Sequence, residues 1–137
     1  MLNGDGEVIE AWTQWDSMLQ RPHFVAINPY DPEKHVIHKF TNDGSELAQS
    51  IGTYGELGDD ETHFNRPSFL AWFSDSSSVV ADGYNGTRVV KFDKDGNYLL
   101  EWGEAGQRGG ETRPSYWHNV HGIAVHADTG RVFVNDR

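Results

Sequence analysis

The sequence predicts an all-β fold made of four-stranded repeats, that is, a segment of a β-propeller. The first observation is composition: 15 Gly, 5 Trp, 5 Tyr and 7 Phe stand among 137 residues, which is typical of short strands joined by tight turns. The second is a recurring Asp-Gly pair, and the third is an apolar landmark that recurs ahead of it. Because the Asp-Gly pair and the apolar segment recur in the same order, the sequence indicates an internal repeat.

The Asp-Gly pair marks the same turn in three units. An Asp-Gly pair between two strand-like runs is a strong hairpin signal, because glycine adopts positive φ without steric cost. A β-branched run that ends in Phe40 or Phe92 comes before two of the pairs, so we expect the turn to join the third and fourth strands of a unit. The pairs are Asp5-Gly6, Asp43-Gly44 and Asp95-Gly96.

The second landmark opens each unit with an apolar strand. Its copies lie 45 and 53 residues apart, and a unit of that length with four strands is typical of a propeller blade. An ordinary β-sandwich of short strands is the alternative, but it gives no reason for landmarks to recur in one order. The copies are Pro22–Ala26, Pro67–Ala71 and Val120–Ala124.

These landmarks predict blades in permuted register. Residues 16–63 and 64–113 each form a blade, whereas residues 114–137 supply strands a and b of a split blade and residues 1–15 supply its strands c and d. The total is three blades' worth of strands, half of a six-bladed ring, and propellers have about four to eight blades. We therefore expect a 3+3 bladed homodimer, in which the C-terminal strands of each chain pair with the N-terminal strands of the other.

Charge and residue content exclude several classes of function. With 11 basic and 21 acidic residues, the formal net charge is −10, which argues against nucleic acid or an anionic membrane as a partner. The absence of cysteine excludes disulfides and a thiol nucleophile. We expect no signal peptide and no transmembrane segment, because the sequence has neither a basic, apolar leader nor an apolar run of about 20 residues. The compartment is left open.

Three stretches resemble a known repeat family. Val79–Phe92, followed by Asp95–Gly103, resembles the NHL repeat. Gly58–Pro67, and His121–Val125 with the later Val134–Arg137, narrow the resemblance to the peptidylamidoglycolate lyases, the lyase part of the peptide-amidating enzymes. Proteins of this family form six-bladed propellers as a rule, and relatives are often extracytoplasmic.

The resemblance implies a zinc-dependent carbon–nitrogen lyase that splits a peptidyl α-hydroxyglycine into a peptide amide and glyoxylate. It implies that His23 and His121 are zinc ligands, that Tyr84 is the base for the substrate hydroxyl, and that Arg137 is a helping arginine. The family's third histidine and its calcium-binding aspartate have no counterpart here, so the catalytic set in this sequence is incomplete.

Other functions stay open, because a fold alone does not fix chemistry. The chain is alternatively a non-catalytic propeller that binds a protein, a peptide or a small molecule, or an inactive gene fragment; bound metal separates the lyase from these. A structural role also explains the presence of several single residues. Tyr84 is then a turn residue and Arg88 forms an ion pair within its blade. Core packing explains Trp12, Trp102 and Phe92. The remaining histidines, among them His35, His63 and His118, are expected at the surface or in loops.

Overall fold

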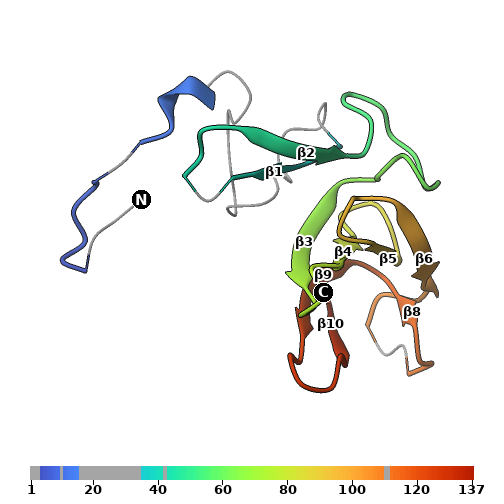
Figure 1. Cartoon of the computed structure of the whole chain (residues 1–137). Helices are drawn as coiled ribbons and strands as arrows, with labels where there is room; N and C mark the ends of the chain where they lie inside the picture. Colours follow the sequence, from blue (N-terminus) through green and yellow to red (C-terminus); the bar gives the residue numbers. More distant parts are fainter. Residues whose placement is uncertain (1–3, 10, 16–34, 42, 110–111) are drawn as a thin grey trace.

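The chain folds into short strands arranged as consecutive small sheets (Figure 1). The computed structural model describes residues 4–9, 11–15, 35–41, 43–109 and 112–137. No α-helix occurs among these residues, which confirms the all-β prediction. The elements are η1 (Thr13–Trp15), β1 (Ile37–Phe40), β2 (Leu47–Ile51), β3 (Pro67–Trp72), β4 (Ser78–Asp82), β5 (Arg88–Phe92), β6 (Tyr98–Trp102), β7 (Glu104–Ala105), β8 (Tyr116–Trp117), β9 (Val120–Val125) and β10 (Val132–Asp136).

One blade is complete. Strands β3, β4, β5 and β6 form a four-stranded antiparallel sheet in chain order, as the repeat predicts for residues 64–113. Every residue of β4 is buried, as are all residues of β5 except Lys91. The Val-rich sequences of these strands lack polar alternation, as is typical of strands that are covered on both faces.

Within the described residues, the complete blade lies between two two-stranded sheets, β1 with β2 and β9 with β10. On one face, Val80, Val90 and Phe92 share a core with residues of β1 and β2. On the other face, Val79, Ala81 and Val89 share a core with residues of β9. Because successive strand residues point to opposite faces, a single Val-rich strand serves both cores. Consecutive blades of a propeller pack in this way, and Phe92 confirms its predicted core position.

The Asp-Gly turns adopt the predicted backbone conformation. Gly44 lies between β1 and β2 with φ 66°, and Gly96 lies between β5 and β6 with φ 83°. Gly6 also has positive φ, 83°, in a bend that follows the turn at Gly4 and Asp5. At Gly44 the missing side chain has a second role, because an added Cβ would lie 2.1 Å from an atom of the Trp12 indole.

The N-terminal segment differs from the strands expected there. Among residues 4–9 and 11–15 only Val8 forms a β-bridge, and η1 covers the last three positions. Strands β9 and β10, which these residues would complete, lie at the opposite end of the molecule (Figure 1). Within the described residues the segment is not paired with β9 or β10, and the assignment of residues 1–15 to a split blade stays a prediction.

Self-association also stays a prediction, and the mass in solution tests it. Light scattering of the 137-residue protein should give about twice the 15.4 kDa of one chain. A mass near 15.4 kDa would exclude the 3+3 arrangement.

As for a membrane-crossing helix, the described residues contain none of sufficient length and hydropathy.

Candidate functional site

An aspartate ends the second strand of two neighbouring blades and fixes the loop ahead of the first strand. Asp82 ends β4, and its carboxylate accepts the Asn65 N–H at 2.8 Å. Asp136 ends β10, and its carboxylate accepts the Asn119 N–H at 2.7 Å. We call these two residues the strand-end aspartates. The predicted site residue Arg137 directly follows Asp136, and Tyr84 lies two residues after Asp82, so the same repeated contact precedes both residues.

The structure brings two of the four predicted site residues together. The Tyr84 Oη lies 2.9 Å from His121 Nε2, a hydrogen bond whose donor depends on the imidazole tautomer. The two rings meet edge to face, with centroids 5.2 Å apart and planes at 84°. Tyr84 follows β4 and His121 lies on β9, so the contact joins adjacent blades.

Two small residues bring the blades close enough for this contact. The buried Ser68 hydroxyl lies 2.9 Å from the carbonyl oxygens of Val120 and of His121. Gly83 lies against the same strand, because a Cβ there would be 1.3 Å from the Val120 oxygen. Ser68 stands in the repeat where β9 carries His121, but only the packing of the blades shows that it holds the backbone of that histidine.

Arg66, which the sequence did not single out, contacts the predicted site residue Tyr84. Its backbone has φ 68°, which non-glycine residues rarely adopt, and it precedes Pro67, where extended conformations are favoured. Such a conformation costs about 1–3 kcal/mol and persists where the surroundings enforce it. The Arg66 guanidinium carbon lies 5.8 Å from the centroid of the Tyr84 ring, and the Arg66 carbonyl accepts the Tyr84 N–H at 3.2 Å.

A buried ion pair supports the loop that carries Tyr84. Arg88 Nε lies 3.0 Å from Asp82 Oδ2, and both side chains are buried. The Arg88 guanidinium also donates to Glu101 and to the carbonyl of His63. Burial raises the pKa of Asp82 to about 7, and the nearby Arg88 charge opposes that rise. The interpretation of Arg88 as an ion-pair residue within its own blade is confirmed.

The other two predicted site residues are not brought to the Tyr84 and His121 pair. His23 lies outside the described residues. Arg137 is exposed, and its backbone N–H donates to the Asn119 carbonyl at 3.0 Å. This hydrogen bond places the Arg137 backbone beside Asn119, two residues before His121. The Arg137 side chain makes no contact with Tyr84 or His121 in the described part of the chain. The roles of all four residues stay predictions.

The remaining histidines are explained by local structure, with one correction. His63 Nδ1 lies 2.8 Å from Asp60 Oδ1, and this hydrogen bond raises the pKa of His63. His118 is exposed, as expected for a loop residue. His35, expected at the surface or in a loop, lies in the loop ahead of β1 but is buried, only 4% exposed. Its carbonyl packs against Gly52, where a Cβ would lie 2.6 Å from the His35 oxygen.

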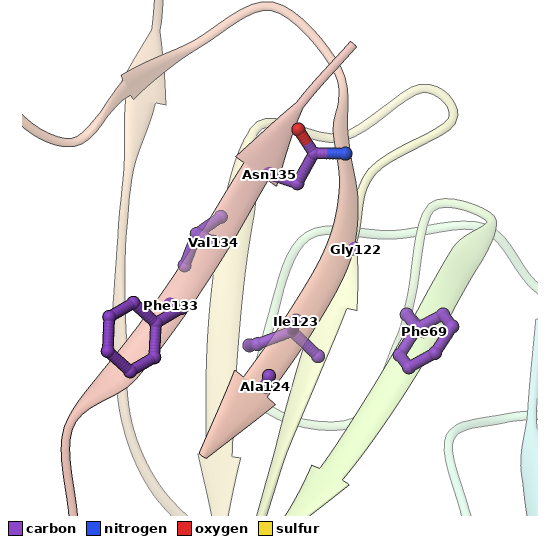
Figure 2. Close-up of a pocket in the computed structure, with 7 residues that line it drawn as sticks. All are labelled: Phe69, Gly122, Ile123, Ala124, Phe133, Val134 and Asn135. Atoms are coloured by element: carbon purple, nitrogen blue, oxygen red, sulfur yellow. The ribbon is translucent and has the colours of Figure 1, made fainter. Parts of the chain in front are cut away.

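An open apolar hollow of about 310 Å³ is lined in part by the residues that follow His121 along β9. Figure 2 shows its lining, with residues from β9 and β10 on one side and Phe69 of β3 on the other. No group of three or more potential metal ligands occurs among the described residues. Of the two predicted zinc ligands, only His121 belongs to the described residues. The lining residues are Phe69, Gly122, Ile123, Ala124, Phe133, Val134 and Asn135.

Comparison with known proteins shows a relationship to amidating lyases. The chain is 31% identical over 107 residues to a probable peptidyl-α-hydroxyglycine α-amidating lyase of Caenorhabditis elegans, a match that covers 78% of this chain and 30% of the relative. It is 31% identical over 88 residues to the peptidylglycine α-amidating monooxygenase of Rattus norvegicus, which covers 64% of this chain and 9% of that protein.

The Protein brain tumor of Drosophila melanogaster is 33% identical over 84 residues, covering 61% of this chain and 8% of that protein. No protein-family model matches the chain. The chain spans less than a third of the length of these relatives. Together with the blades described above, these similarities identify an NHL-like propeller segment that is related to the lyases.

Proposed function

We propose that this chain contributes part of a lyase centre that cleaves a peptidyl α-hydroxyglycine into a peptide amide and glyoxylate. Tyr84 is the base in this proposal and His121 is a zinc ligand. The observation that carries it is the 2.9 Å contact between Tyr84 Oη and His121 Nε2 across two blades. The name of the worm relative, a probable peptidyl-α-hydroxyglycine α-amidating lyase, supplies the substrate class.

The chemistry asked of this chain is a proton transfer. The deprotonated Tyr84 oxygen accepts the proton of the substrate hydroxyl. The carbon that carries the hydroxyl becomes the aldehyde carbon of glyoxylate, its bond to the amide nitrogen breaks, and that nitrogen takes up a proton. A bound zinc ion supplies Lewis acidity toward a substrate oxygen.

The described residues fit one position of a zinc site. The Nε2 atom of a neutral imidazole is a common zinc donor. A zinc ion on His121 Nε2 would replace the hydrogen bond that this atom makes with Tyr84. In the proposal His23 supplies a second donor, from a segment outside the described residues. The described part of the chain shows no further ligand group, so the proposal leaves the rest of the zinc set and any calcium ligand unassigned.

Zinc titration of the 137-residue protein, followed by NMR of the histidine rings, tests the proposal. The His121 ring signals should respond to zinc. The His121→Ala variant should bind zinc at least about tenfold more weakly, the loss that even partners of metal ligands cause. His118→Ala is the matched control, because His118 is exposed and lies three residues away. Unresponsive His121 signals, or equal losses in both variants, would refute the zinc role and favour the non-catalytic binding alternative.

A further inference from the structure

We propose that Arg66 is a positioning residue for Tyr84, holding the phenol in its place against His121. The inference rests on the proposed function in that it treats Tyr84 as the reacting group. Its geometric content does not, because it concerns only the contacts of Arg66 with Tyr84 and of Tyr84 with His121.

The backbone contacts give the first line of support. The Arg66 carbonyl accepts the Tyr84 N–H at 3.2 Å, and the Asn65 carbonyl accepts the Asn85 N–H at 3.3 Å. Two consecutive hydrogen bonds therefore tie the loop before β3 to the loop after β4. A non-glycine residue with φ 68° is held against its preference. Arg66, which adopts this unfavourable conformation, contacts Tyr84 through both its backbone and its side chain.

The side chain gives the second line of support. A guanidinium group within about 6 Å of a ring centroid is attracted to the ring face, and the Arg66 guanidinium carbon lies 5.8 Å from the Tyr84 centroid. The Tyr84 ring also meets the His121 ring edge to face. Arg66 Nε is buried, and within the described part of the chain it has no hydrogen-bond partner. The ring contact, rather than a bond at Nε, thus accounts for the position of this side chain.

Three variants separate positioning from general stability. Arg66→Gly removes the side chain and suits the positive φ, so its thermal midpoint should not fall. Arg66→Met removes the charge while keeping a long side chain, and Arg66→Lys restores the charge. Arg113→Met is the matched control, because the Arg113 guanidinium carbon lies 3.8 Å from the centroid of another tyrosine, Tyr116.

The measurement is the NMR cross-relaxation between the Tyr84 and His121 ring protons in the zinc-free protein. The population of the ring pair should fall about 2- to 5-fold in Arg66→Gly and Arg66→Met, as the loss of a cation–π contact supports. Arg66→Lys should recover part of the signal, and Arg113→Met should leave it unchanged.

An unchanged ring signal in Arg66→Met would overturn the positioning role, as would an equal loss in Arg66→Lys. If Arg66→Gly fails to fold, the Met and Lys variants carry the test. Failure of the two proposals is distinguishable. Loss of the ring signal together with no zinc response at His121 would sustain Arg66 and refute the zinc role, whereas a zinc response with an unaffected ring signal would do the reverse.

Discussion

Gly83→Ala should lose about 3 kcal/mol or more of unfolding free energy, at the upper end of overpacking effects. The added Cβ would lie 1.3 Å from the Val120 oxygen and 2.3 Å from its carbonyl carbon. Both atoms belong to the backbone of β9, so relief requires the whole strand to move away from the complete blade. Such a shift would also separate Tyr84 from His121. Urea unfolding followed by tryptophan fluorescence measures the loss.

Gly4→Ala is the control for this prediction. A Cβ at Gly4 would meet no atom within 4 Å, so the substitution adds the same methyl group without a clash. The unfolding midpoint of Gly4→Ala should match that of the unchanged protein. Equal midpoints for both variants would show that β9 does not approach Gly83 as closely as described.

Arg88→Met should lose about 3–5 kcal/mol, the usual effect of removing one partner of a buried ion pair. Arg88 is 6% exposed and Asp82 is fully buried. The substitution leaves the Asp82 carboxylate without its cation. It also removes the donor to the His63 carbonyl, which Arg88 Nη2 reaches at 2.6 Å. Calorimetric unfolding near neutral pH measures the loss.

The destabilisation by Arg88→Met should grow as the pH rises. Burial raises the pKa of Asp82 from 3.8 to about 7 in the folded protein, so folding takes up a proton between those values. The contribution of Asp82 to stability is therefore fully present below its unfolded pKa and is lost as the pH rises through about 7. Without the opposing Arg88 charge the folded carboxyl holds its proton more tightly. The loss should thus be smaller at a pH of about 5 than at a pH of about 8.

Lys94→Met is the control for the ion pair. Lys94 Nζ lies 2.6 Å from Asp95 Oδ2, but the two side chains are 65% and 63% exposed. Solvent screens such a pair, so its removal should change stability little at either pH. If Arg88→Met proved as mild as Lys94→Met, or lost equal stability at both pH values, the buried pair would not support the Tyr84 loop.

Local sequence predicted much of the fold because its signals are local in origin. Gly44 and Gly96 follow aspartate between strand-like runs, and both adopt the positive φ that such hairpin loops require of one residue. The Val-rich runs of β4 and β5 are buried on both faces, which hydrophobic pattern alone indicates. The order of the two landmarks was enough to predict four strands in one blade, and β3 to β6 confirm that prediction.

The sequence by itself predicted the repeat and its turns, because each depends on a short motif, and its resemblance to the lyases made Tyr84 and His121 candidate site residues. Only the tertiary structure decided that these two side chains meet, since they lie 37 residues apart on different blades. The close approach of Gly83 to Val120 and the strained backbone of Arg66 were likewise decided there. The physical reason is the same for all three. A contact between neighbouring blades depends on how sheets pack, and no pattern within one strand encodes the distance between two.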